Sequence, residues 1–368
     1  MIDYQYLIDY FEEFPFLIQL AWRISGLFLV AIFLLTIYLK VIRYHLRKKE
    51  NEYKVFKNQY EALLVEYLYA DEESEEAHTK QKAIISKIKS HIPIKYKRKM
   101  VLSVLYNLLN EVSGEMAESI KTLYYETGLI DYALTKLENK NWYVIAKGIG
   151  ELRRFKIEES YGDIINFIEH SKKEVRNETQ LYLVNLFRFD GLTFLNELKT
   201  PLSEWTQLQL LEVLQKFDDQ QICDIKPWLK SKNDSVVLFA LKLAQIYNQF
   251  EMKDILIELL SHDKKEIRIC VIEVLTHLYG IEAKEMLKAN FNELSIEEQI
   301  SFFGLLEKLV VPSDEPFIEK HIFHKNFEIQ LLALKILKTI NLDKFMGLNK
   351  LSSNKKAPVM FKFVNNIS

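Results

Sequence analysis

Residues 263–280 read DKKEIRICVIEVLTHLYG and contain the pattern from which the fold of the chain can be predicted. Val271, Leu275 and Leu278 recur at the i, i+4, i+7 spacing of an amphipathic helix. The same stripe returns along the last two-thirds of the sequence. Its central column recurs after 31, 31, 30, 31, 31 and 31 residues, at Leu152, Leu183, Leu214, Ala244, Leu275, Leu306 and Leu337.

Two further columns flank this leucine column. The column four residues earlier is Gly148, Thr179, Leu210, Ala240, Val271, Phe302 and Ala333, and the column three residues later is Phe155, Leu186, Phe217, Tyr247, Leu278, Leu309 and Ile340. A separate register marks a first helix in each unit, at Ile164, Phe194, Ile225, Ile255, Met286 and Phe317. Seven copies of a period near thirty predict stacked helical hairpins, because one such unit buries its apolar face only against its neighbours.

The composition supports an almost wholly helical protein. Apolar residues make up 49% of the 368 residues, whereas the chain has only 10 glycines and 7 prolines to break helices. The formal net charge of −2 excludes a general electrostatic attraction to nucleic acid. Cys223 and Cys270 show no metal-binding spacing, and we interpret them as buried thiols in a reducing compartment.

The repeat resembles a known family. The segment Asp263-Lys-Lys-Glu-Ile267-Arg268 is similar to the HEAT-like repeat of armadillo-type α-solenoids, and residues 172–176 and 233–236 match it more loosely. The resemblance covers about residues 130–345. It implies that the acidic residue opens the second helix, that the Val-Arg pair packs and bridges repeats, and that a curved inner surface binds macromolecules. Residues 205–207 and 297–299 keep the period but lack the Val-Arg pair.

A second feature is the uncharged run ISGLFLVAIFLLTIYL, residues 24–39. Extended upstream to Phe16, it reaches the roughly 20 residues that cross a hydrocarbon core. Arg23 would then reach the outer boundary with its long stem, and Trp22 and Tyr38 lie where an aromatic belt is expected. A run of this length also fits a buried core helix. The flanking charges favour a transmembrane helix.

Those flanks differ in charge. Acidic residues precede the run (Asp3, Asp9, Glu12 and Glu13), and basic residues follow it (Lys40, Arg43, Arg47, Lys48 and Lys49). The positive-inside rule places the basic side in the cytoplasm. We therefore predict a single-pass protein of the cell (inner) membrane with its N-terminus outside and its repeats in the cytoplasm. The acidic start of the chain argues against a cleaved signal peptide.

The predicted organisation is all-α, with a single transmembrane helix followed by about seven HEAT-like repeats. Its segments are a short N-terminal segment (1–15), a transmembrane helix (16–42), a juxtamembrane helical region (43–94), atypical capping helices (95–139), repeats (140–345) and a tail (346–368). The first fourteen residues fit an interfacial helix or a simple extension of the anchor. Residues 71–76 fit a solvated acidic turn, the acidic first turn of the next helix or a docking site. Residues 95–99 fit a basic helix start or a contact with the membrane surface.

The positions two before and one after the leucine column are expected to face outward. Their charges alternate in sign, which suits a protein partner or salt bridges between neighbouring repeats better than a phosphate backbone. Arg153 and Arg154, with Lys147 a turn earlier, form the densest basic spot. The candidate partner-binding residues are Lys147, Arg153, Arg154, Glu212, Lys242, Glu273 and Lys335.

Catalytic patterns are weak. Gly148-Ile-Gly150 lacks the third glycine and the strand of a dinucleotide fingerprint, and no carboxylate or cysteine completes a metal site with His321 and His324. The chain has no His-Glu dipeptide of the kind that HEAT-like di-iron enzymes use. Its anchor and balanced charge argue against a HEAT-like DNA glycosylase.

We therefore expect no enzymatic activity, no cofactor, no metal, no nucleic acid and no small-molecule ligand. The leading hypothesis is a membrane-anchored scaffold that holds a protein partner at the bilayer. One alternative is an accessory subunit of an integral membrane enzyme, such as an envelope-polysaccharide glycosyltransferase. A further alternative is a HEAT-like enzyme whose site carries no recognisable motif.

Overall fold

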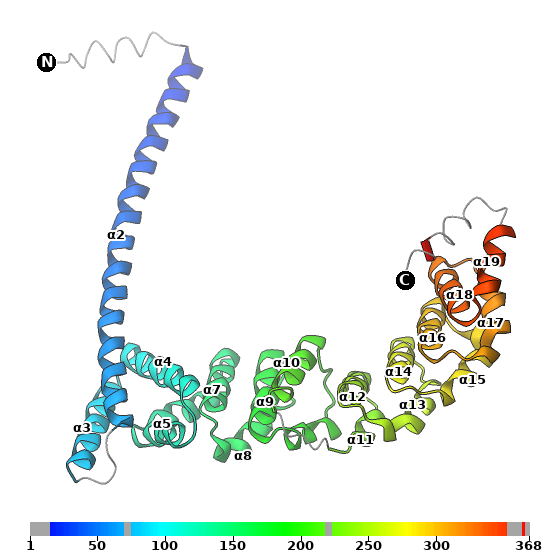
Figure 1. Cartoon of the computed structure of the whole chain (residues 1–368). Coiled ribbons are helices and arrows are strands. Elements are labelled where there is room, and N and C mark those ends of the chain that lie inside the picture. Colours follow the sequence, from blue (N-terminus) through cyan, green and yellow to red (C-terminus); the bar gives the residue numbers. More distant parts are fainter. Residues whose placement is uncertain (1–14, 70–74, 218–222, 352–362, 365–368) are drawn as a thin grey trace. The chain divides into compact units, whose positions relative to one another are not determined.

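The structure, a computed structural model, describes residues 15–69, 75–217, 223–351 and 363–364. Within these ranges it contains α-helices and short 3₁₀ helices and no strand, so the predicted all-α class is confirmed (Figure 1). The predictions for residues 1–14 and for the acidic residues 71–74 lie outside the described residues, as does most of the tail. Contacts divide the chain into two compact units, residues 1–134 and 135–368, and each is described by itself.

The uncharged run belongs to one long helix, α2 (Phe16–Leu68). Pro15 precedes its first turn, and no proline follows within the helix to interrupt it. The predicted transmembrane helix (16–42) and the first part of the predicted juxtamembrane helical region (43–94) thus form one continuous helix. In the described part of the chain, α2 is the one helix long and apolar enough, by length and composition, to cross a membrane. Its apolar window is not buried.

The last turns of α2 pack into the first unit. Their buried side chains are Tyr60, Leu64 and Tyr67, which recur at helical spacing and contribute to a core with three shorter helices. The Tyr60 hydroxyl lies 2.7 Å from Nδ1 of His91, the last residue of the first of these helices. The helices are α3 (Glu75–His91), α4 (Lys95–Glu111) and α5 (Glu115–Glu126), and the division between the units falls within α6 (Leu129–Leu137).

The second unit contains seven helices whose N-caps follow the predicted period. The N-caps are Asn141, Lys172, Ser203, Asn233, Lys264, Ser295 and Asn326, again separated by 31, 31, 30, 31, 31 and 31 residues. The helices are α7 (Trp142–Arg154), α9 (Lys173–Phe187), α10 (Glu204–Leu214), α12 (Asp234–Ile246), α14 (Lys265–His277), α16 (Ile296–Leu309) and α18 (Phe327–Ile340). Helices that follow one another in this series contact each other, for example α7 with α9 and α14 with α16.

Two of the three predicted columns form the core of this unit. Every residue of the leucine column is at most 1% exposed, and every residue of the column four positions earlier is buried. The column three positions later is buried only at Phe155 and Leu278. Its positions lie within the last two residues of a helix or up to three residues beyond its end.

The first helices are shorter and less regular than the periodicity predicts. They are broken into α-helical turns and 3₁₀ segments: η1 (Glu158–Ser160), α8 (Tyr161–Ile164), η2 (Ile165–Phe167), η3 (Asp190–Asn196), α11 (Lys226–Leu229), η4 (Phe250–Met252), α13 (Lys253–Leu259), α15 (Glu282–Ala289), η5 (Phe291–Glu293), η6 (Pro312–Asp314) and α17 (Glu315–His321). Helix α19 (Leu342–Leu351) follows the last repeat. Several of these short segments pack against the long helix that follows them, for example α11 against α12 and α13 against α14.

Candidate partner-binding surface

Three of the predicted partner-binding residues contact the neighbouring long helix. Arg153 on α7 donates to Glu178 on α9 at 3.0 Å, and Lys242 on α12 donates to Gln207 on α10 at 2.9 Å. Lys335 on α18 lies 3.8 Å from Glu307 on α16. Of the two readings that the sequence left open for these residues, the contacts favour polar bridges between repeats.

The other four candidates do not converge on a common site. Lys147 and Arg154 are exposed on α7, Glu212 pairs with Lys216 on the surface of α10 at 3.0 Å, and Glu273 is exposed on α14. Their role in partner binding stays a prediction.

The expectation that positions two before and one after the leucine column face outward is wrong on α9. Leu181 and Val184 occupy those positions and are buried. Helix α9 contacts α7, α10 and η3, so it is covered on more sides than a simple two-neighbour stack requires. Gly191 in η3 lies directly on the α9 backbone, where an added Cβ would meet the Leu183 carbonyl oxygen at 2.3 Å.

The histidines that the sequence singled out have structural partners. His324 Nδ1 accepts the backbone N–H of Asn326, and His170 and His262 accept from the backbone two residues on in the same way. His321 lies among aromatic rings, with centroids 4.6 Å from Phe291 and 4.5 Å from Phe317, and burial lowers its pKa. Among the described residues no group of three or more His, Cys, Asp or Glu side chains is arranged to hold a metal ion.

The HEAT-like resemblance implies that the Val-Arg pairs pack in the core and bridge repeats, and the structure agrees with this in part. Val175 and Ile267 are buried, and Arg176 and Arg268 each donate to the backbone carbonyl six residues earlier, at 2.7 Å in both cases. Arg268 also reaches the next long helix, where its Nε lies 2.6 Å from the buried Glu298 carboxylate. This hydrogen bond raises the pKa of Arg268. Arg176 makes no such hydrogen bond to the next long helix among the described residues, so one of the two pairs bridges repeats.

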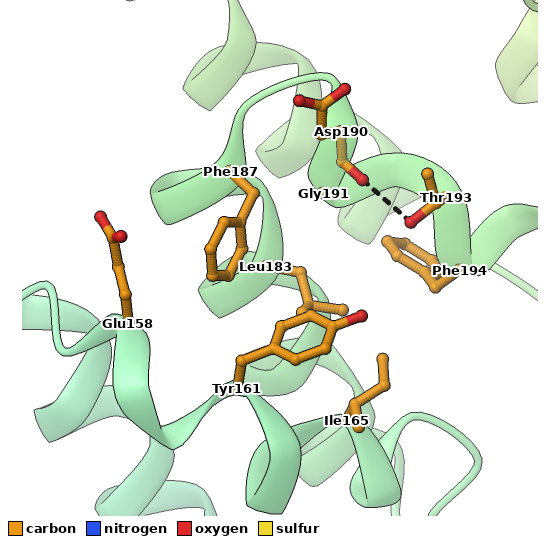
Figure 2. Close-up of a pocket in the computed structure, with 9 residues that line it drawn as sticks. All are labelled: Glu158, Tyr161, Ile165, Leu183, Phe187, Asp190, Gly191, Thr193 and Phe194. Carbon is orange, nitrogen blue, oxygen red and sulfur yellow. Dashed lines mark hydrogen bonds between the residues drawn. The ribbon is translucent and has the colours of Figure 1, made fainter.

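An apolar groove on the second unit is the best candidate for a binding site, and no motif in the sequence predicts it (Figure 2). It has a volume of about 470 Å³ and lies where α8, α9 and η3 meet. Figure 2 shows the rings of Tyr161, Phe187 and Phe194 around it, with Leu183 between them and Ile165 to one side. The rings of Tyr161 and Phe187 meet edge to face, with centroids 5.3 Å apart.

The rim of this groove carries negative charge. Glu158 and Asp190 line it and are exposed, and Asp163 is exposed beside Tyr161. The Thr193 hydroxyl donates to the Asp190 backbone carbonyl at 2.9 Å, which fixes the turn that carries the acid (Figure 2). Apolar walls with an acidic rim fit an apolar side chain that is flanked by lysine or arginine.

The sequence could not reveal this groove because its residues belong to different registers. Phe194 belongs to the first-helix register, Leu183 to the leucine column, and Tyr161, Ile165 and Phe187 to no column. A usable signal was the presence of two aromatic residues outside the columns, Tyr161 before α9 and Phe187 at its end.

The predicted membrane-flanking residues lie along α2. Trp22 and Tyr38 are each 60% exposed, and Lys40, Arg43, Arg47 and Lys48 are exposed. The side chain of Lys49 lies outside the described part.

Two cations of the second basic cluster, residues 95–99, lie over aromatic rings of the first unit. Lys97 lies over the Phe56 ring at 5.4 Å, and the Arg98 guanidinium lies over the Tyr132 ring at 4.0 Å.

No family model and no curated protein sequence matches the chain. Among solved structures, it is similar to an engineered protein, with 11% identity over 58% of this chain and 96% of that one and a TM-score of 0.31. It is also similar to the complex of CpcE and CpcF of phycocyanin lyase from Nostoc sp. PCC7120, with 12% identity over 73% of this chain and 94% of that one and a TM-score of 0.24. These values are too low to assign an activity to the chain.

Proposed function

We propose that this chain is a membrane-anchored scaffold whose HEAT-like repeats bind a protein partner and hold it at the bilayer. The observation that carries the proposal is the groove bounded by Tyr161, Phe187 and Phe194, an exposed apolar hollow on a polar surface. Exposed apolar hollows rimmed by charged residues are typical of protein-binding sites. The buried columns that recur with the period support the solenoid part of the proposal.

Helix α2 supports the anchor. A helix with an unburied apolar window has no protein core to cover it, and a bilayer would remove the exposed rings and aliphatic chains from water. The basic residues that follow the window favour a cytoplasmic position for the repeats. An anchored scaffold raises the local concentration of its partner in the plane of the membrane.

A binding role fits the groove better than catalysis. Its walls are aromatic and aliphatic, and its one hydroxyl donor outside the tyrosine, Thr193, is engaged with the backbone. The two half-buried thiols elsewhere, Cys223 and Cys270, have their pKa values raised to about 11 by burial, which suppresses the thiolate needed for nucleophilic chemistry. The acidic rim also opposes a phosphate backbone.

Site-specific photocrosslinking in intact cells tests the proposal. A photoreactive phenylalanine analogue at Tyr161, which is 43% exposed, should crosslink to one protein, and the same analogue at the exposed Tyr279 serves as the control. The crosslink should be lost when Phe187 is changed to Glu in the same chain, with helicity and expression unchanged. A soluble crosslinked protein supports the scaffold. An integral membrane enzyme supports the accessory-subunit alternative, and equal labelling from Tyr161 and Tyr279 contradicts binding in the groove.

A further inference from the structure

We propose that a hollow on α2 between Tyr44 and Phe56 binds the phosphate headgroup of an anionic phospholipid. The hollow has a volume of about 580 Å³, and its lining includes Arg47, Lys48 and Asn51 on one face of the helix. The proposal rests on the membrane anchor of the proposed function and adds a ligand class to it. Cationic and amide donors beside an exposed tyrosine are groups that bind phosphate at a membrane boundary.

The basic residues near the hollow differ in their ion pairing from those further along the same helix. Lys54 pairs with Glu50 at 3.2 Å, and Lys57 pairs with Glu61 at 3.3 Å. In the described part of the chain, by contrast, no acidic side chain lies within ion-pair distance of Arg43, Arg47 or Lys48. Glu52 also lines the hollow and is four residues from Lys48, so it weakens the positive field there without neutralising it.

The position of the hollow along the helix agrees with a headgroup layer. At 1.5 Å per residue, Arg43 lies about 6 Å and Arg47 about 12 Å beyond Leu39, the last residue of the uncharged run. The polar layer on each side of the hydrocarbon core is about 5–8 Å thick, and a long arginine side chain extends several ångströms back toward it. The cations of the hollow therefore reach lipid phosphates when Leu39 marks the boundary.

The same estimate excludes the second basic cluster as part of this site. Lys97 lies over Phe56, and Phe56 is about 25 Å beyond Leu39 along the helix. Measured from the outer edge of the polar layer, about 5–8 Å beyond Leu39, the remaining distance still exceeds the Debye length of about 8 Å at physiological ionic strength. Residues 95–99 are therefore not part of the proposed headgroup site, and their contact with the membrane surface stays a prediction.

Lipid binding to the detergent-solubilised full chain tests the proposal, with native mass spectrometry as the readout. We expect dioleoylphosphatidylglycerol to bind more tightly than dioleoylphosphatidylcholine. Changing Arg47 and Lys48 together to Gln should weaken phosphatidylglycerol binding by about 30-fold, since each cation near an anionic surface contributes about a factor of 5. Lys54→Gln with Lys57→Gln removes two paired cations of the same helix and should change the affinity less than 3-fold.

A gain-of-function variant completes the test. Glu52→Gln should strengthen phosphatidylglycerol binding severalfold and leave phosphatidylcholine binding unchanged. Equal affinity for both lipids, or a Glu52→Gln variant that matches the parent, would overturn the headgroup site. Binding of glycerol 3-phosphate as tightly as of phosphatidylglycerol would overturn the lipid as the source of the phosphate. A chain that fails to enter nanodiscs of either lipid contradicts the anchor itself, whereas equal entry into both with no charge effect contradicts only the headgroup site.

Discussion

At the scale of single residues, the most consequential polar group is the buried Asp314 carboxylate. It is fully buried and accepts from Lys284 Nζ at 2.9 Å and Lys288 Nζ at 2.5 Å, with the Val311 backbone N–H as a third donor. Burial opposes its ionisation, but the hydrogen bonds from the two lysines outweigh that effect, and the pKa of Asp314 lies below its ordinary value. Asp314→Asn leaves Lys284, whose side chain is 4% exposed, buried without its counter-charge.

We expect Asp314→Asn to destabilise the fold by about 3–5 kcal/mol, measured by thermal or urea unfolding. Because the folded-state pKa is depressed, the stabilisation is present above the unfolded value near 3.9 and is lost as pH falls through the folded value. The difference between parent and variant should therefore shrink below about pH 4. Glu212→Gln, which removes an exposed ion pair, is the matched control and should change stability by at most about 1 kcal/mol. A loss for Asp314→Asn no larger than that of the control would contradict the argument.

The same substitution, glycine to alanine, should have opposite effects on the stability of the chain at Gly304 and at Gly191. Gly304 lies inside α16 with no atom within 4 Å of an added Cβ, so Gly304→Ala should stabilise the chain by about 1 kcal/mol through helix propensity. An added Cβ at Gly191 would meet Leu183 backbone atoms at 2.3 and 2.6 Å, so Gly191→Ala should destabilise it by about 1–3 kcal/mol. Urea midpoints of the two variants measure both effects. Loss of stability in both would show that helix α16 is also closely covered at Gly304.

At the scale of elements, the sequence predicts the long helices well and the short ones poorly. The leucine column and the column before it are buried because a stacked helix presents one stripe to its neighbours on every turn. Segments such as α8 and α11 have four residues each, too few for a helical period to establish itself. The helix ends were also not predictable, because Lys156, Asn248 and Tyr279 take positive φ there in place of glycine.

One of these ends yields a prediction about helix termination. Tyr279 has φ 54° and is 62% exposed, and the next residue, Gly280, donates to the Leu275 carbonyl at 2.8 Å. Tyr279→Gly removes the strain of a left-handed aromatic residue, offset in part by the extra freedom of glycine in the unfolded chain, so we expect a stabilisation of about 0.5 kcal/mol. Tyr143→Gly changes another exposed tyrosine at an ordinary position of α7 and should destabilise by about 0.5–1 kcal/mol. The sign difference between the two variants in thermal unfolding is the test.

At the scale of the whole molecule, the candidate site was less predictable than the fold. The outward positions of the repeat were predicted from periodicity alone, and Arg153, Lys242 and Lys335 among them contact a neighbouring helix. Periodicity describes what all repeats share, whereas the groove at Tyr161 exists because η3 packs on α9 through Gly191. Such a local departure depends on three segments coming together, and no single window of sequence contains it.

A stack of repeats has a property that a single globular core lacks, and this property can be measured. If each repeat contacts only its neighbours, a local defect should loosen the adjacent repeats and leave distant ones intact. Asp314→Asn should therefore raise amide hydrogen exchange in α15, α16 and α17 by an order of magnitude or more, since α15 carries the two lysines, α16 packs on α15 and α17 packs on η6. Exchange in α7 and α9 should match the parent protein. A uniform rise across all seven long helices would mean that the second unit unfolds as one cooperative core, and the proposed HEAT-like stack would then be wrong.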